Sequence, residues 1–308
     1  MAEPRFRYRA FGLIVETPRR FPYLWPEPDA ARIADIRVEF SPWTPPDNPP
    51  SLSFDMISFY GTDCAVFTIA PGQRIICLGG NRIVVDLTRP VSEAELHTWI
   101  FGRPIGWLLH QRGLTPLHAA VVRVGSVAIA LAGHSGAGKS TLARAMVGRG
   151  HGVMSDDLAI IDPSSLLVEP GFASLKLWES AAVANGDDVK QAVAVKVEAN
   201  KFHIPLPDAF DPTPAALGLV VAIGRDTARS DFRMLRLTQR QAEAMLQYHI
   251  MNTQLARQSG SAAIGFQWSL TVASKVPVMA LDRPDRMDDL PLICAQIEQI
   301  VSRRIEQQ

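Results

Sequence analysis

The sequence predicts an α/β fold with a mixed sheet, preceded by a smaller β-rich region. A glycine-rich segment, residues 133–140, lies between an apolar run typical of a strand and a pattern typical of a helix. Short apolar runs separated by Gly, Pro and Asn fill roughly the first hundred residues, as in β-rich proteins. We therefore expect a β-rich N-terminal region over residues 1–110 and a second domain, with C-terminal helices, over residues 111–308.

The composition is that of a soluble globular protein: of 308 residues, 47% are apolar and 20% are charged. Lys plus Arg and Asp plus Glu both number 31, so the net charge favours neither nucleic acid nor an anionic membrane as a partner. No apolar signal segment follows Met1 and no run of about 18 apolar residues predicts a membrane span, so we expect a cytoplasmic protein. Cys64, Cys77 and Cys294 lack metal-ligand spacing and are expected to be buried.

The N-terminal region is expected to contain short strands and, near its end, a helix. The clearest strands are the apolar runs 57–60, 64–69 and 82–86. The proline-rich segment 41–50 is expected to be an exposed loop, because proline removes donors and restricts the residue before it. A helix is predicted over 92–111, with Ser92 as its cap and a kink or break at Gly102 and Pro104.

The second region begins with two strands, 119–124 and 127–131, whose short link at Gly125 and Ser126 predicts an antiparallel hairpin. A helix over 139–149 should follow the glycine-rich segment. Further strands are expected at 153–155, 158–161, 193–197, 217–223 and 276–281, and further helices at 238–250 and after Asp285.

The glycine-rich segment matches the phosphate-loop pattern G-x-x-x-x-G-K-[ST] in full, through Gly133, Gly138, Lys139 and Ser140. The expected nucleotide-binding residues are Gly133, His134, Ser135, Gly136, Ala137, Gly138, Lys139, Ser140 and Thr141. Glycines let backbone N–H groups approach phosphate oxygens, and the following helix adds the positive end of its dipole. Lys139 would reach the β- and γ-phosphates and Ser140 would ligate Mg²⁺. The alternative is a glycine-rich turn that binds nothing.

Two adjacent carboxylates, Asp156 and Asp157, lie 17 positions or more beyond Lys139, after one helix and one strand. This spacing should return them to the carboxyl end of the neighbouring strand, beside the loop. Successive strand residues point to opposite sides, so one carboxylate would hold Mg²⁺ and the other would face an acceptor hydroxyl. The alternative is a solvated acidic turn.

His118 comes immediately before the predicted hairpin. It could lie near the acidic pair, where it would shift their pKa or contact the acceptor. The alternative is a histidine whose ring is satisfied by backbone groups at a strand start.

Taken together, segments 117–119, 133–141, 149–151 and 155–157 resemble the HPr kinase/phosphatase family, whose core is similar to phosphoenolpyruvate carboxykinase. The resemblance implies ATP and Mg²⁺ as cofactors, a P-loop kinase domain over 111–308, and assembly into a homo-oligomer. By the same resemblance, Asp156 activates the acceptor serine hydroxyl, Asp157 is a metal ligand together with Ser140, and His118 lies near both aspartates.

The chain departs from that family after residue 157, where Leu175–Glu179 replaces a glutamate-isoleucine-arginine-glycine signature. Lys176 is either a phosphate contact or a surface residue, Glu179 or Glu169 could be a further metal ligand, and dephosphorylating activity is not expected. Over segments 11–13, 175–178, 276–278 and 281–284 the chain is similar to a divergent HPr-kinase-like group found with ribosomal peptide modification systems, including lasso peptide clusters. That resemblance implies a peptide substrate.

The function predicted is an ATP- and Mg²⁺-dependent kinase that phosphorylates a serine hydroxyl of a protein or precursor peptide. One alternative is a small-molecule kinase of the shikimate or gluconate type, in which Arg225, Arg229, Arg233 and Arg236 would form a lid rather than a solvated strand pair. The other is a nucleotide-binding regulator without transfer activity. The sequence fixes neither the acceptor nor a preference for ATP over GTP.

Overall fold

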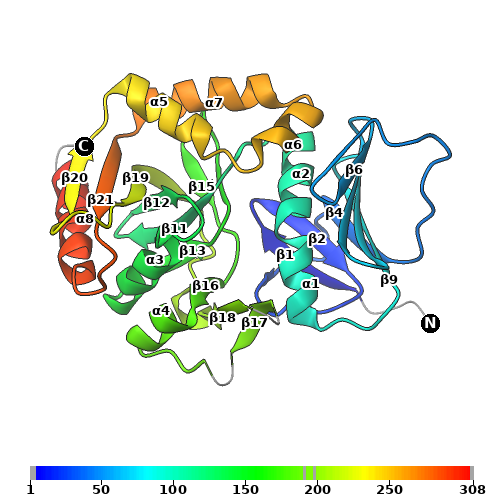
Figure 1. The fold of residues 1–308 in the computed structure, drawn as a ribbon, viewed down its shortest axis with the longest axis horizontal. Coiled ribbons are helices and arrows are strands. Elements are labelled where there is room, and N and C mark those ends of the chain that lie inside the picture. Colours follow the sequence, from blue (N-terminus) through cyan, green and yellow to red (C-terminus); the bar gives the residue numbers. More distant parts are fainter. Residues whose placement is uncertain (1–4, 190–191, 197–198, 306–308) are drawn as a thin grey trace. The chain divides into compact units, whose positions relative to one another are not determined.

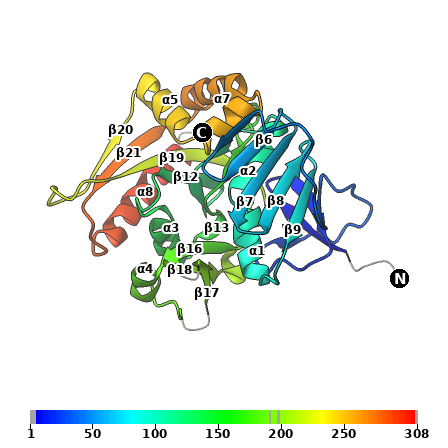
Figure 2. The same cartoon turned by 45° about the vertical axis from the view of Figure 1, so that its right-hand side comes forward.

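The computed structural model describes residues 5–189, 192–196 and 199–305. The chain divides into two compact units. The first comprises residues 1–116 and 251–266, and the second comprises residues 117–250 and 267–308. Figures 1 and 2 show their elements, which are described for each unit in turn.

The first unit is built on one mixed sheet with the strand order β3-β1-β2-β4-β9-β8-β7-β6-β5. Its strands are β1 (Phe6–Ala10), β2 (Leu13–Thr17), β3 (Trp25–Pro26), β4 (Ile36–Phe40), β5 (Leu52–Phe54), β6 (Ile57–Tyr60), β7 (Cys64–Ala70), β8 (Gln73–Leu78) and β9 (Arg82–Leu87). Strand β4 runs parallel to β2 and β9, whereas the other pairs are antiparallel. The expected strands 57–60, 64–69 and 82–86 are confirmed, and segment 41–50 has no helix or strand and is largely exposed.

Two helices replace the single helix predicted over 92–111: α1 (Glu93–Ile100) and α2 (Arg103–Gln111). Ser92 and Glu95 form a capping box, and the break lies at Gly102, with Pro104 in the first turn of α2. The split is therefore confirmed where the sequence placed it.

The segment 251–266 joins the first unit through α2. Nε2 of His110 lies 2.8 Å from the carbonyl oxygen of Met251, and Nδ1 lies 3.2 Å from the hydroxyl of Ser261. Helix α6 (Thr253–Gln258) lies between these two contacts and packs against α2. Both ring nitrogens of His110 are thus used to fasten this returning segment.

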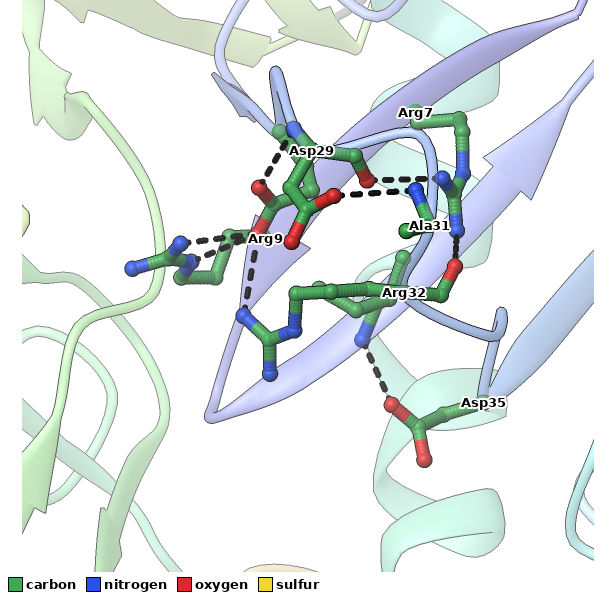
Figure 3. Close-up of polar contacts among 8 residues, drawn as sticks. Arg7, Arg9, Asp29, Ala31, Arg32 and Asp35 are labelled. Carbon is green, nitrogen blue, oxygen red and sulfur yellow. Dashed lines mark hydrogen bonds and ion pairs between the residues drawn. The ribbon is translucent and has the colours of Figure 1, made fainter.

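The buried carboxylate of Glu27 pairs with arginine side chains in this unit. Glu27, whose side chain is 1% exposed, accepts hydrogen bonds from Nε and Nη2 of Arg9 at 3.1 and 2.8 Å and from Nη1 of Arg32 at 3.1 Å. Nη1 of Arg7 donates to the carbonyl of Asp29 at 2.8 Å, and Figure 3 shows the three arginines around this loop. The hydrogen bond from Arg9 lowers the pKa of Glu27 below its ordinary value of 4.5.

We predict that Glu27→Gln lowers the free energy of unfolding by about 1–3 kcal/mol at pH 7, because two guanidinium groups lose a charged partner. Since the folded-state pKa of Glu27 is lowered, its contribution is present above pH 4.5 and is lost as the pH falls through the folded-state pKa. Urea unfolding of both proteins from pH 7 to 3 should therefore show the difference shrinking at acid pH. Glu39→Gln is the matched control: Glu39 pairs with Arg82 on an exposed face, so its change should stay near zero. Equal losses in the two variants would contradict the prediction.

The second unit contains a larger mixed sheet, order β10-β14-β15-β19-β12-β11-β13, in which β21 also pairs with β19, and β20 pairs with β21. Its strands are β10 (Pro116–Leu117, at the boundary between the units), β11 (Ala119–Val124), β12 (Val127–Gly133), β13 (Gly152–Ser155), β14 (Ala159–Ile161), β15 (Leu167–Glu169), β19 (Ala215–Arg225), β20 (Arg233–Arg236) and β21 (Val278–Arg283). A separate small sheet, order β16-β18-β17, consists of β16 (Ser174–Trp178), β17 (Val193–Lys196) and β18 (Ala199–Pro205). The helices are α3 (Lys139–Gly148), α4 (Glu179–Ala184), η1 (Pro207–Ala209), α5 (Gln239–Tyr248), α7 (Ala262–Lys275, which begins in the first unit) and α8 (Leu290–Ile305).

Strand directions decide which residues meet at one edge of the larger sheet. Strand β11 is antiparallel to both β12 and β13, as the predicted hairpin requires for β12. The carboxyl ends of β12 and β13 therefore lie at the same edge as the amino end of β11. Strand β13 is not the direct neighbour of β12 that the sequence analysis expected, because β11 lies between them.

Helices cover both faces of this sheet, as Figure 1 shows. Helices α5 and α7 supply Leu246, Trp268 and Val272 to a buried cluster with alternate residues of β11 and β12. On the opposite face, α3 packs against β11 and β12 and also contacts α8. Because both faces are buried, the strands read as continuous apolar runs rather than as alternating ones.

Several elements of this unit differ from the expectations. Helix α7 was not predicted, although Trp268 is buried and donates from Nε1 to the carbonyl of Ile161 at 2.9 Å. The strand expected at 193–197 is β17, which ends at Lys196; Val197 lies outside the described residues. Within the described part of the chain, no helix is long and apolar enough to cross a membrane.

Candidate functional site

The glycine-rich segment forms a loop between the end of β12 and the start of α3. Gly136 and Gly138 have φ of 84° and 97°, a region that suits glycine. A Cβ on Gly133 would lie 2.9 Å from the carbonyl oxygen of Ile223 on β19, so this position also requires glycine. No side chain caps α3 at Gly138, which leaves the N–H groups of its first turn for an anion.

We predict that Gly138→Ala strains the loop and weakens phosphate binding. An alanine at φ 97° is unfavourable, and its Cβ would also lie 3.3 Å from Nη1 of the buried Arg283. Gly136→Ala is the matched control, since it has a similar φ of 84° but no atom within 4 Å of the added Cβ. We expect each variant to lose about 1–2 kcal/mol of stability from backbone strain, with the larger loss at Gly138. Thermal unfolding would measure the stability of both variants, and titration with tripolyphosphate would measure their phosphate binding. A smaller loss of stability in Gly138→Ala than in Gly136→Ala would contradict the prediction.

Lys139 is buried, with 5% of its surface exposed. Its Nζ donates to the carbonyl oxygens of Gly133 and His134 at 2.9 and 3.0 Å. Burial lowers the pKa of Lys139, and the charges of Asp157 and Asp156 oppose this shift. The ammonium group is therefore held inside the loop beside the acidic pair.

Asp156 contacts Ser140, the loop residue expected to bind a metal. The hydroxyl of Ser140 donates to Oδ1 of Asp156 at 2.8 Å, and the backbone N–H of Lys176 donates to Oδ2 at 2.7 Å. Only 1% of Asp156 is exposed. Burial, followed by the charge of Asp157, raises the pKa of Asp156.

Asp157 occupies a different environment from its neighbour. Its φ of 64° is left-handed, and its Oδ2 lies 2.7 Å from Nζ of Lys176 on β16. Burial favours a raised pKa, but the charges of Lys176 and Lys201 and the hydrogen bond from Lys176 lower the pKa of Asp157 well below its ordinary value. Asp157 is thus an ionised carboxylate facing cations, while Asp156 is held beneath the loop.

His118 precedes β11 and is half-buried. Its backbone N–H donates to the carbonyl of His249 at 2.8 Å, at the end of α5. Burial, together with the charge of Lys139, lowers the pKa of His118 to about 4, so the imidazole is neutral at pH 7. A neutral ring can accept a hydrogen bond at one nitrogen and donate one from the other.

These elements enclose one pocket within the second unit. Its lining residues are His118, Ser135, Gly136, Gly138, Lys139, Ser140, Thr141, Asp157, Lys176, Trp178, Lys201 and Arg225. Three loop residues expected to bind nucleotide do not line it: the carbonyls of Gly133 and His134 accept hydrogen bonds from Lys139, and Ala137 is buried. Asp156 supports Ser140 from below rather than lining the pocket.

The ring of His134 turns toward α5. Its centroid lies 5.1 Å from that of Tyr248 and 5.5 Å from that of His249. Of the two glutamates considered as further metal ligands, Glu169 lies on β15 and Glu179 begins α4, and neither lines the pocket. The described residues include no group of three or more His, Cys, Asp or Glu side chains that could hold a metal ion by themselves.

Lys201 is the pocket residue that sequence reasoning missed entirely. Only six lysines occur in the sequence, which otherwise uses arginine for positive charge, and Lys139, Lys176 and Lys201 all line this pocket. Because lysine is scarce in this sequence, each lysine could have been considered as a candidate site residue. Arg225, considered above as part of a lid, lies at the end of β19 and also lines the pocket.

No protein-family model matches the chain. No curated protein matches it either. Among solved structures, the chain is similar to the HPr(Ser) kinase/phosphatase from Coxiella burnetii, with a TM-score of 0.30 and 14% identity, over 62% of this chain and 91% of that one. A similarity at this level transfers neither an activity nor a residue's role to this chain.

Proposed function

We propose that this chain is a Mg²⁺-dependent kinase that transfers the γ-phosphate of ATP to a serine hydroxyl of a protein or peptide. The observation that carries the proposal is the hydrogen bond from Ser140 to Asp156, in a pocket that also holds Lys139 and Asp157. A loop hydroxyl joined to a buried carboxylate is the arrangement by which phosphate-loop enzymes hold a nucleotide-bound metal.

The charges of the pocket suit a triphosphate. Lys139, Lys176, Lys201 and Arg225 face it together with the first turn of α3, and Asp157 is the acidic side chain of its lining. The bonds from Lys139 to the loop carbonyls would be exchanged for bonds to the β- and γ-phosphates. Such a site binds polyphosphate through positive charge and backbone N–H groups.

The residues also fit Mg²⁺, which keeps several waters and needs only one or two protein oxygens besides the phosphates. Because Ser140 donates its proton to Asp156, a lone pair of the hydroxyl oxygen remains for the metal. When bound, Mg²⁺ would neutralise charge on the β- and γ-phosphates. Ser140 would hold it, with Asp156 orienting that hydroxyl.

We assign the acceptor side of the site to Asp157, which reverses the division of roles expected from the sequence. Asp157 faces the pocket, whereas both oxygens of Asp156 are engaged below it. The acceptor oxygen would form a bond to the γ-phosphorus as the bond to the β,γ-bridging oxygen breaks and its electron pair leaves with ADP. The acceptor proton would pass to Asp157 and then to solvent; because the transition state is loose, a weak base suffices.

The choice of serine in a protein or peptide is supported by the sequence resemblance over residues 117–157. The test is transfer from γ-labelled ATP with Mg²⁺ to three classes of acceptor in parallel: a serine-containing precursor peptide, HPr, and a panel of small hydroxylated metabolites. Label on serine of the peptide or of HPr, lost with excess EDTA, is the expected result. Label only on a metabolite would contradict a protein or peptide acceptor and favour a small-molecule kinase. Tight ATP binding with no labelled acceptor would favour a nucleotide-binding regulator without transfer activity.

A further inference from the structure

The small sheet presents one functional face to the phosphate loop. On β16, Lys176 and Trp178 are two residues apart and therefore share a face of the strand. In the register with β18, Trp178 lies opposite Lys201 and Lys176 lies opposite His203. Lys176, Trp178 and Lys201 all line the phosphate pocket, so this face places an indole beside two ammonium groups.

Trp178 is exposed where the rest of its strand is buried. Residues 174–177 are buried, but 48% of the surface of Trp178 is accessible. Among the described residues, no ring stacks on the indole and no hydrogen bond fixes it. A large aromatic surface left open at the rim of a polar, cationic pocket is not explained by packing of this unit.

This inference rests on the proposed function, because a nucleotide that places its phosphates in the loop must place its base nearby. The geometry points to Trp178 as the platform on which the nucleobase stacks, while Lys201 beside it contacts the phosphates. Stacking on an indole uses the π-face that every base has, and it contributes about tenfold or more to affinity. The pocket lining offers no Asn or Gln to read a base edge. Trp178 should therefore bind adenine and guanine nucleotides with similar affinity.

The test compares nucleotides with a ligand that has phosphates but no base. Calorimetry would measure the binding of ADP, GDP and inorganic tripolyphosphate, each with Mg²⁺, to the full chain and to Trp178→Ala and Trp178→Phe. We expect the alanine variant to lose about tenfold in affinity for ADP and GDP alike, and to bind tripolyphosphate within about twofold of the unchanged protein. The phenylalanine variant should keep most of the nucleotide affinity.

Tyr248→Ala is the matched control, since Tyr248 is 64% exposed and contacts the ring of His134 but does not line the pocket. A loss of nucleotide affinity there, with none at Trp178, would overturn the inference by moving the platform to α5. Unchanged ADP affinity in Trp178→Ala would also overturn the inference. Trp178 would then be a candidate contact for the acceptor rather than for the nucleobase. Failure of the unchanged protein to bind tripolyphosphate or nucleotide would instead reject the proposed function on which the inference rests.

Discussion

Replacement of Lys139 by alanine is expected to lower the rate of phosphoryl transfer by roughly 10²–10³-fold and to weaken ATP binding. The ammonium group lies inside the loop, where a low local dielectric strengthens its attraction for phosphate oxygens. Its loss would remove positive charge where the transferring phosphate gains negative charge. Steady-state kinetics with varied ATP, together with ATP titration, would measure both effects.

The unfolding temperature of Lys139→Ala shows whether Lys139 acts in function or in stability. Because burial lowers the pKa of Lys139, the folded protein holds its charged form at a cost. Lys139→Ala should therefore unfold at the same temperature as the unchanged protein or at a higher one, without nucleotide. Lys275→Ala is the matched control, since Lys275 only donates to the carbonyl of Pro163 on an exposed surface. A destabilised Lys139→Ala with normal transfer would contradict the assignment.

Asp157→Asn is expected to lower transfer by roughly 10²–10⁴-fold while leaving ATP affinity nearly unchanged. The amide cannot take the acceptor proton, and it pairs less well with Lys176, whose ammonium lies 2.7 Å from the carboxylate. Asp156→Asn should behave differently, because Asp156 orients the Ser140 hydroxyl. We expect that variant to need more Mg²⁺ for half-maximal rate and to recover much of its activity at saturating Mg²⁺.

The two variants decide between the division of roles proposed from the geometry and the one expected from the sequence. Transfer by each would be followed at low and saturating Mg²⁺, with Ser140→Ala as the companion to Asp156→Asn. If Asp156→Asn stays inactive at saturating Mg²⁺ while Asp157→Asn transfers normally, Asp156 is the acceptor-side carboxylate. That outcome would reject Asp157 as the residue that takes the acceptor proton.

Much of the second unit could be predicted because its signals are local. Gly125 and Ser126 are too short a link for anything but a hairpin, and the glycines of the loop have conformations or close approaches that other residues resist. The break between α1 and α2 follows from Gly102 and Pro104 in the same way. These features depend on a few neighbouring residues, so they can be predicted from the sequence alone.

The arrangement of the two carboxylates could not be predicted, because strand alternation stops before them. Strand β13 ends at Ser155, and Asp157 adopts a left-handed backbone, so the alternation assumed for the pair does not apply. The contact between Asp156 and the backbone of Lys176 joins residues 20 positions apart across two sheets. Pairings of this kind depend on tertiary packing, as does α7, whose Trp268 finds its partner on β14.

Lys176 serves both carboxylates, but through different atoms. Its backbone N–H donates to Asp156, and any residue other than proline would keep that bond. Its side chain pairs with Asp157, and only this bond depends on the identity of the residue. Replacement of Lys176 by any residue other than proline would therefore remove the cation paired with Asp157 while the backbone bond to Asp156, and with it the contact of Asp156 with Ser140, persists.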